Sequence, residues 1–167
     1  SWTSPKSRQA WENTLKEYLY SRFYLQDATI DLKDLDFYSE VGKGSFGSVS
    51  FVKNRKNKQT YALKAMTKNH IDHENLHVNV SLEKKILLKI DHPFIVKLVK
   101  TIKDANKKFI FFLMEYVNGK ELFDVIRDIG YLNADENTFY SASILTAITY
   151  LHERKIIYRD LKPENII

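Results

Sequence analysis

The chain of 167 residues has the length of one modest domain, and 44% of its residues are hydrophobic, which is enough to build a core. It contains no cysteine, so disulfide scaffolds, thiolate metal sites and cysteine nucleophiles are excluded. The formal net charge of +5 is mild, and its densest basic patch covers residues 53–58. We interpret this patch as a solvated turn, with nucleic-acid contact as the weaker alternative.

The sequence also carries no membrane or targeting signal. No apolar run is long enough to cross a bilayer, and no charged-then-apolar leader begins the chain. We therefore expect a soluble, untargeted protein, and the absence of cysteine fits a reducing compartment such as the cytoplasm. No internal repeat or low-complexity tract suggests a different organisation.

The first half of the chain is predicted to be rich in strands. After a flexible lead-in, apolar residues at helical spacing predict an amphipathic helix over residues 11–24. A helix over residues 70–90 is predicted to end before Pro93, whose ring cannot continue a helix. Alternating apolar residues predict five strands, at residues 37–41, 48–52, 60–66, 95–102 and 108–114, the last two forming a hairpin.

The pattern then changes to helices. One helix is predicted over residues 121–129, stopped by Gly130, and a longer one over residues 134–153. Asn133 and Glu136 have the spacing of a capping box at the start of the longer helix.

A glycine-rich run from Val41 to Val49 is the first pattern that carries chemistry. Glycines at this spacing let the backbone approach a polyphosphate without interference from a Cβ. A dinucleotide site would need a helix directly after Gly47, whereas residues 48–52 alternate like a strand. We favour a hairpin folded over phosphates, and an ordinary turn stays open as the alternative.

The second pattern joins Lys64 to Glu83. Lys64 follows Ala62 and Leu63 in an apolar strand, where a buried ammonium requires a partner. Glu83, in the predicted helix, could supply it, and Lys64 would then hold the α- and β-phosphates of a nucleotide. The alternatives are a solvated lysine and an exposed glutamate in a helix pair of little energetic consequence.

The third pattern is the run from Tyr158 to Asn165. It places the carboxylate of Asp160, the ammonium of Lys162 and the amide of Asn165 within six residues. In phosphoryl transfer, Asp160 would orient the acceptor hydroxyl and receive its proton, while Lys162 would offset charge. Asn165 would bind Mg²⁺ through its amide oxygen. The alternative is a structural loop stiffened by Pro163.

Together these runs resemble a eukaryotic protein kinase, from about Leu35 to the last residue. Lys162 is typical of serine/threonine kinases, and Tyr158 in place of histidine is typical of the AGC group. Residues 91–98, 114–117 and 150–154 look like the cyclic-nucleotide-dependent kinases, the cGMP branch being favoured over the cAMP branch. The resemblance implies an α+β fold, with a five-stranded antiparallel small lobe, one main helix and the first helices of a truncated helical large lobe.

The resemblance also implies a division of the chain and a set of site residues. The divisions are an N-terminal extension (1–34), the small lobe (35–114), a hinge (115–119) and the start of the large lobe (120–167). The cofactors are ATP and Mg²⁺, the latter on Asn165, and the catalytic residues are Asp160, Lys162, Lys64 and Glu83. The nucleotide-binding residues are Val41, Gly42, Lys43, Gly44, Ser45, Phe46, Gly47, Val49, Ala62, Lys64, Met114, Glu115, Val117, Glu121, Glu164 and Ile167.

Within that set, Glu121 would reach the ribose and would form an acidic surface with Glu164, which favours substrates with Arg or Lys before the phosphorylated Ser or Thr. Lys120 departs from the family pattern, because it puts a positive charge where a glycine is common. A cyclic-nucleotide-binding region, in cis or in trans, would regulate the kinase.

No Asp-Phe-Gly, activation loop or Ala-Pro-Glu occurs in the 167 residues, so we expect them to be inactive alone. The interpretation also requires Lys64 and Asp160 to face the same cleft. The alternative function is a nucleotide-binding regulatory half-kinase without catalysis.

Overall fold

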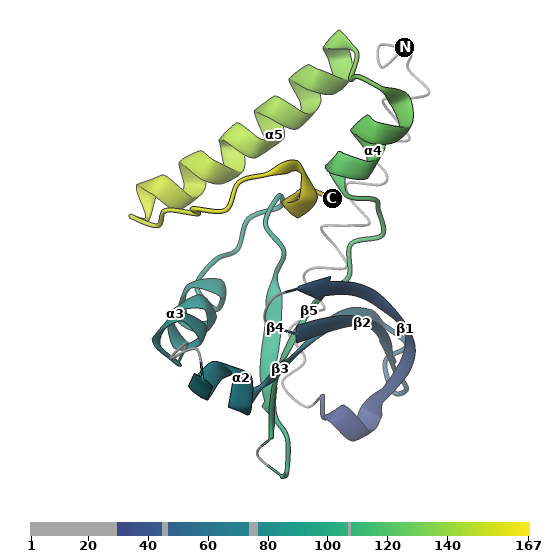
Figure 1. Ribbon diagram of the computed structural model, residues 1–167, viewed down its shortest axis with the longest axis vertical. Helices are drawn as coiled ribbons and strands as arrows, with labels where there is room; N and C mark the ends of the chain where they lie inside the picture. The colour runs from purple at the N-terminus through teal and green to yellow at the C-terminus, as the bar shows by residue number, and fades with distance from the viewer. Residues whose placement is uncertain (1–29, 45–46, 74–76, 107) are drawn as a thin grey trace. The chain divides into compact units, whose positions relative to one another are not determined.

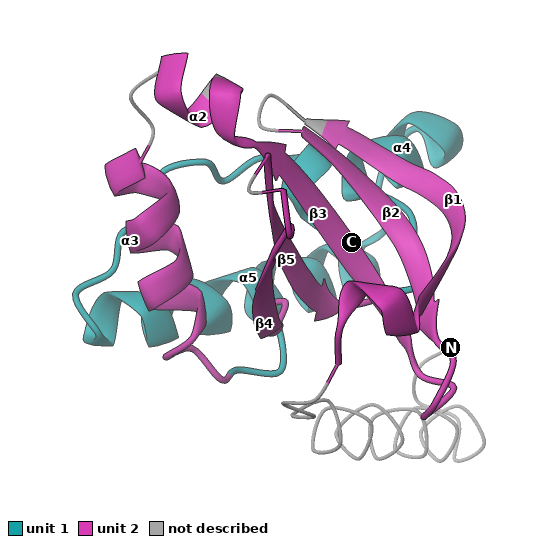
Figure 2. Ribbon diagram, turned by 90° about the horizontal axis from the view of Figure 1, so that it is seen from below, with its two compact units in different colours: residues 1–16, 92–95, 117–167 teal, residues 17–91, 96–116 magenta. Residues whose placement is uncertain are grey.

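The computed structural model describes residues 30–44, 47–73, 77–106 and 108–167. The helix predicted over residues 11–24, and Ser45 and Phe46 of the glycine-rich run, lie outside the described residues. The described chain forms two compact units (Figure 2). The smaller unit contains residues 92–95 and 117–167, and the larger contains the described parts of residues 30–91 and 96–116.

The larger unit is built on a five-stranded antiparallel sheet with the strand order β1-β2-β3-β5-β4 (Figure 1). A short 3₁₀ helix, η1 (Leu32–Asp34), precedes the sheet. The strands are β1 (Leu35–Gly44), β2 (Gly47–Asn54), β3 (Thr60–Thr67), β4 (Leu98–Lys103) and β5 (Phe109–Glu115). The predicted α+β fold class and the hairpin of the last two strands are confirmed.

One strand prediction is wrong at its start. The strand predicted from Ile95 begins only at Leu98. The Ile95 N–H donates to the His92 carbonyl at 3.1 Å, so residues 92–95 form a turn instead of extending the strand.

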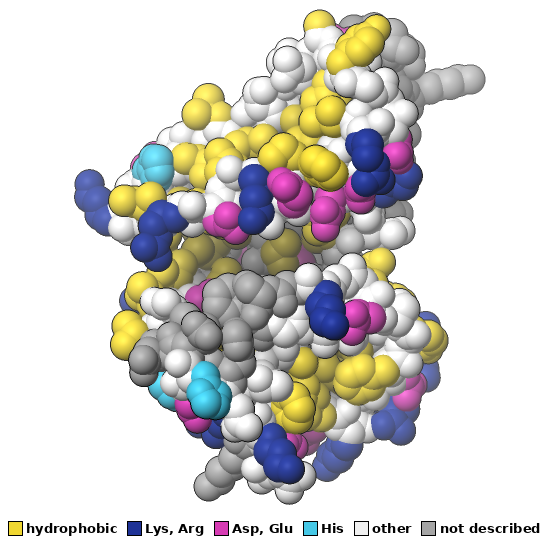
Figure 3. Space-filling view, viewed as in Figure 1, with side chains coloured by type: hydrophobic (Ala, Val, Ile, Leu, Met, Phe, Trp, Pro, Cys, Tyr) yellow, Lys and Arg dark blue, Asp and Glu magenta, His cyan; other side chains and the backbone are white. Residues whose placement is uncertain are grey.

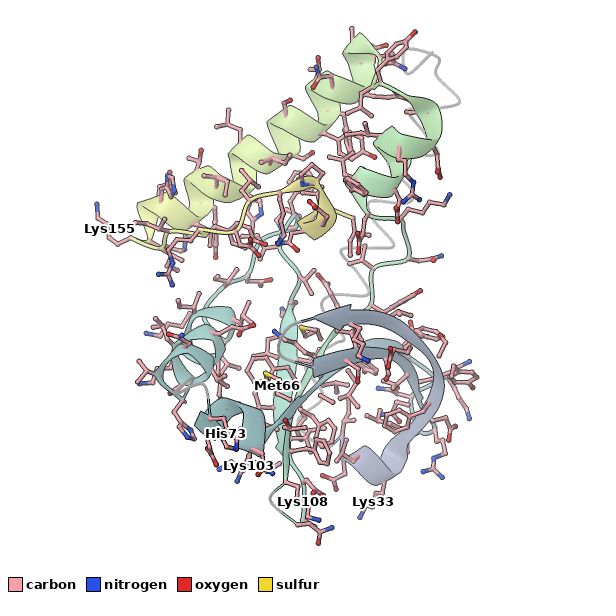
Figure 4. The ribbon with its side chains drawn as sticks, viewed as in Figure 1. Lys33, Met66, His73, Lys103, Lys108 and Lys155 are labelled. Carbon is pink, nitrogen blue, oxygen red and sulfur yellow. The ribbon has the colours of Figure 1, made fainter. Side chains whose placement is uncertain are left out.

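The side chains of β3 show how one strand serves both faces of the sheet. Tyr61 and Leu63 are buried on one face, and Lys64 and Met66, with the alternate parity, point to the other. The first face carries a core of Ile30, Leu35, Val52, Tyr61, Leu63, Ile102 and Leu113. The second face carries a core of Met66, Ile71, Val80, Leu98 and Phe112, in which Met66 lies beside the helices (Figure 4).

Two helices supply part of this second core: α2 (Lys68–His73) and α3 (His77–Leu87). Figures 1 and 2 show both helices towards the β4 edge of the sheet, away from β1. The single helix predicted over residues 70–90 is therefore wrong, and Pro93 is not what ends it. α3 stops at Leu87, and beyond it the Lys89 N–H donates to the Ile86 carbonyl at 2.9 Å, three residues back, as in a 3₁₀ turn.

The smaller unit contains α4 (Leu122–Ile129), α5 (Ala134–Glu153) and the 3₁₀ helix η2 (Pro163–Asn165). Gly130, at a φ of 86°, ends α4 as predicted. The capping box of α5 is confirmed, since Asn133 Oδ1 accepts the Glu136 N–H at 3.0 Å and Glu136 Oε2 accepts the Asn133 N–H at 2.9 Å. None of the helices described combines the length and apolar character that a membrane span needs.

Gly47 gives a direct test of the β2–β3 packing. It adopts a φ of 142°, and a Cβ added there would lie 1.8 Å from the Ala65 carbonyl oxygen. We expect Gly47→Ala to lower the free energy of unfolding by more than about 2 kcal/mol, measured by urea denaturation.

Gly42→Ala is the matched control, because the nearest atom to its added Cβ is Val49 Cβ at 3.9 Å. We expect the control to change the free energy of unfolding by no more than about 0.5 kcal/mol. Equal stability of the two variants would contradict the close approach at Gly47.

Candidate active site

The glycine-rich run is a β-hairpin. Gly44 of β1 pairs with Gly47 of β2, and β2 begins at once, so the helix that a dinucleotide site requires is absent from this place. Val41 is 48% exposed and Lys43 is exposed. Packing does not require glycine at position 42, where a Cβ would meet only ordinary contacts. Close approach of a ligand to the backbone remains a physical reason for glycine there.

The register of the sheet gathers four of the predicted nucleotide-binding residues on one face. Val49 of β2 lies opposite Lys64 of β3, and Ala62 of β3 lies opposite Met114 of β5. Directly opposed residues in an antiparallel pair point to the same side, and so do residues two apart in one strand. All four side chains therefore belong to the face that also carries Phe112, the partner of Lys64 on β5.

Lys64 is held by α3. Its Nζ lies 3.0 Å from Glu83 Oε1, and the two side chains are 21% and 40% exposed. Phe112, with its ring centroid 6.0 Å from Nζ, covers the lysine from β5. An ammonium this sheltered needs a charged partner, whereas a partly exposed pair contributes only about 0–1 kcal/mol to stability. The pair therefore fixes where the ammonium lies more than it stabilises the fold.

Glu115, at the end of β5, is buried and forms hydrogen bonds with Lys97, which directly precedes β4. Its N–H donates to the Lys97 carbonyl at 3.0 Å, and its Oε1 accepts the Lys97 N–H at 3.0 Å. A contact from the main chain of Glu115 to a ligand would therefore use its carbonyl oxygen. Val117 follows in the connecting segment and is half-buried.

The end of α5 turns the chain towards the Asp160 run. Lys155 adopts a φ of 60°, and the Ile156 N–H reaches back to the Leu151 carbonyl at 3.0 Å, as in a Schellman motif. Arg159, next to Asp160, is also left-handed, with a φ of 65°. Non-glycine residues in this region are uncommon and concentrate at functional sites.

Asp160, Lys162 and Asn165 come together as the sequence predicts for a functional cluster. Lys162 Nζ lies 3.1 Å from Asp160 Oδ1. Asn165 Nδ2 donates to Asp160 twice, at 2.8 Å to Oδ2 and at 2.9 Å to the carbonyl oxygen. Pro163 occupies the first position of η2, where its missing N–H has no cost, and the 3₁₀ turn brings Asn165 back to Asp160.

These contacts set the charge state of the cluster. The hydrogen bond from Lys162, and then that from Asn165, hold the pKa of the exposed Asp160 carboxyl below its ordinary value, so the group is ionised at neutral pH. Burial, followed by the Asp160 charge, raises the pKa of Tyr158, which stays neutral. The cluster therefore presents a carboxylate beside an ammonium and an amide.

A hydrogen bond joins this loop to the start of α4. The Leu122 N–H donates to the Ile166 carbonyl at 2.7 Å, which brings Glu121, the N-cap of α4, to the same region as Glu164 of η2. Both glutamates are exposed. Gly119 lies close to Ile167, whose Cγ2 would be 2.8 Å from a Cβ added at position 119.

The predicted residues thus form two groups, one in each unit. The larger unit brings Lys64 to Glu83 and to the face with Val49, Ala62 and Met114. The smaller unit gathers the residues of the loop and the start of α4: Glu121, Asp160, Lys162, Glu164, Asn165 and Ile167.

Sequence reasoning missed Asp128, which binds Lys120 at 3.1 Å. Lys120 precedes α4 and Asp128 lies near its end, so the spacing of helical ion pairs gives no signal for this contact.

Comparison with known proteins gives a consistent family. A model of the protein kinase domain matches residues 35–167. The chain is 45% identical to a cGMP-dependent protein kinase of Eimeria tenella over 150 residues, which cover 90% of the chain and 15% of that protein. It is 43% identical to the cGMP-dependent protein kinase of Plasmodium berghei (strain Anka) over 159 residues, which cover 95% of the chain and 18% of that protein.

A human cAMP-dependent protein kinase catalytic subunit is 43% identical over 136 residues, which cover 81% of the chain and 37% of that subunit. The chain therefore spans well under half the length of each of these relatives.

The Asp160 contacts predict a measurable titration. A carboxyl whose pKa is depressed by folding stabilises the protein at pH values above its ordinary pKa of 3.8. That stabilisation is lost as the pH falls through the lower pKa of the folded state. We expect Lys162→Met to raise the pKa of Asp160 towards 3.8, measured by carbon NMR of its carboxyl. Lys120→Met, which removes the partner of Asp128, should leave the pKa of Asp160 unchanged. An unmoved Asp160 pKa in Lys162→Met would refute the assigned cause.

Proposed function

This chain belongs to the protein kinase domain family, and from that premise we propose that the full-length protein is a serine/threonine kinase that transfers the γ-phosphoryl group of ATP. The observation that carries the proposal is the Asp160 cluster, in which one carboxylate contacts both the Lys162 ammonium and the Asn165 amide. Phosphoryl transfer depends chiefly on positioning and on charge stabilisation, and these three groups are suited to both.

The residues present fit a nucleotide with a divalent cation. Asn165 uses its Nδ2 for both hydrogen bonds to Asp160, and its amide oxygen is a ligand type that Mg²⁺ accepts. Gly42, with room that packing does not use, suits a backbone that approaches phosphate. When bound, Mg·ATP supplies the phosphoryl group and neutralises charge on its oxygens.

In the larger unit, Lys64 would bind the α- and β-phosphates, and Glu83 would fix its position. Val49 and Ala62 would cover adenine, with Met114 behind it, and main-chain groups of Glu115 and Val117 would contact the adenine edge. The face of the sheet that Val49, Ala62 and Met114 share supports this assignment. Further nucleotide contacts are proposed for Val41, Gly42, Lys43, Gly44, Ser45, Phe46, Gly47, Glu121, Glu164 and Ile167.

In the smaller unit, Asp160 would orient the acceptor hydroxyl and receive its proton as the acceptor oxygen bonds to the γ-phosphorus, whose bond to the bridging oxygen of the departing ADP breaks. Its lowered pKa makes it a weak base, so orientation contributes more than proton abstraction before transfer. Lys162, 3.1 Å from Asp160, would offset charge on the phosphoryl group.

We further propose a basic substrate class and cyclic-nucleotide control. The exposed carboxylates of Glu121 and Glu164, brought to one region by the Leu122–Ile166 hydrogen bond, would favour peptides with Arg or Lys before the acceptor. The likeness to proteins named cGMP-dependent kinases supports regulation by cGMP, through a region in cis or in trans. We propose a cytoplasmic location.

Replacing the acceptor-orienting carboxylate tests the proposal. We expect Asp160→Asn in the full-length protein to lower kcat by about 10²–10⁴-fold, because hydroxyl orientation and proton acceptance are lost. The measurement is transfer of radiolabelled phosphate from ATP to a peptide containing Arg and Ser. Glu153→Gln, which changes an exposed carboxylate at the end of α5, should retain full activity.

A regulatory half-kinase gives a different result. It would bind ATP, detected by calorimetry, while the unaltered full-length protein transferred no phosphate.

A further inference from the structure

We propose that Asp128 determines how strongly the site prefers basic substrates, because it neutralises the Lys120 ammonium beside the acidic surface of Glu121 and Glu164. The inference rests on the proposed kinase function and assigns to Asp128 a specificity role that does not involve the reacting atoms. Asp128 would act through Lys120, so it is a positioning residue.

The contacts of α4 form a short ion-pair chain. Lys120 Nζ lies 3.1 Å from Asp128 Oδ2, and Arg127 Nη2 lies 2.9 Å from Asp124 Oδ1. Arg127 also approaches Asp128 Oδ1 at 3.8 Å. Lys120 and Asp128 are 69% and 46% exposed, and pairs this exposed contribute little to stability. The Lys120–Asp128 pair therefore matters more for the electrostatic potential at the proposed substrate surface than for the stability of the fold.

The pair lies next to the proposed substrate surface. Glu121 is the chain neighbour of Lys120, and the next residue, Leu122, is tied to Ile166 at 2.7 Å. Glu164 of η2 is therefore brought close to the start of α4. Figure 3 shows acidic and basic side chains gathered over α4 and η2.

Charges in this region nearly cancel, and the remainder is negative. Three of the carboxylates are matched by cations, in the pairs Lys120–Asp128, Arg127–Asp124 and Lys162–Asp160. Within the described part of the chain, Glu121 and Glu164 make no ion pair. These two carboxylates carry the excess negative charge, and one unit of it is lost when Asp128 no longer balances Lys120.

Removing Asp128 should therefore weaken the binding of a basic substrate, and removing Lys120 should strengthen it. Asp128→Asn leaves an unbalanced cation beside Glu121, which repels Arg and Lys of a substrate, whereas Lys120→Gln adds one unit of negative charge. A unit charge at roughly 7 Å in a water-like dielectric changes affinity by about threefold, and salt screens the effect. The double variant restores the balance of the native pair.

The test compares two peptides in the full-length protein, one with Arg before the acceptor Ser and one with Gln in the same positions. We expect Asp128→Asn to raise KM for the Arg peptide by about threefold, with kcat and KM for the Gln peptide unchanged. Lys120→Gln should lower KM for the Arg peptide, and the double variant should return it to near the native value.

Lys155→Gln is the matched control, since it removes one positive charge at the end of α5 that lies away from α4 (Figure 4). It should leave both KM values unchanged. Unchanged KM values for the Arg peptide in both test variants, or equal shifts for both peptides, would overturn the inference.

Binding distinguishes failure of the inference from failure of the proposed function. If the protein transfers no phosphate, the kinase proposal fails, and fluorescence anisotropy of labelled Arg and Gln peptides still tests Asp128. Weaker binding of the Arg peptide alone in Asp128→Asn supports the inference, and equal binding of that peptide to native protein and variant refutes it.

Discussion

The antiparallel register of β2, β3 and β5 is the constraint on which the rest of the larger unit depends. A shift of β3 by one residue would exchange its two faces, placing Tyr61 and Leu63 where Lys64 now lies. The core on one face therefore fixes the ammonium on the other. Glu83, presented by α3, then selects one position for that ammonium. Packing and the proposed nucleotide contact thus follow from the same pairing of strands.

The smaller unit relies on local backbone geometry instead of a large core. α5 ends at Lys155 in a left-handed conformation, Arg159 adopts another, and Pro163 begins η2. Each of these positions bends the chain over a few residues. Their combined result is that Asn165 returns to Asp160, which lies five positions earlier in the chain. The Leu122–Ile166 hydrogen bond then joins the bent loop to α4.

Sequence reasoning succeeded where a pattern is local. The alternation of β3, the capping box of Asn133 and Glu136 and the stop at Gly130 all depend on neighbouring residues, and each is confirmed. Sequence reasoning failed at the end of α3, because residues 88–92, which follow the helix, contain no glycine or proline to mark the turn before Pro93. The Lys64–Glu83 contact was anticipated from residue chemistry, whereas the Lys120–Asp128 contact has no helical periodicity to announce it.

The double donation by Asn165 has a consequence for which side chains the loop tolerates. Asp, Asn and Leu share nearly the same branched shape, yet they differ in what they offer to Asp160. An isosteric carboxylate would set a like charge against Asp160, and an aliphatic side chain would offer it no donor. The amide alone combines an N–H for its neighbour with an oxygen for a cation, so shape conservation at this position does not preserve the chemistry.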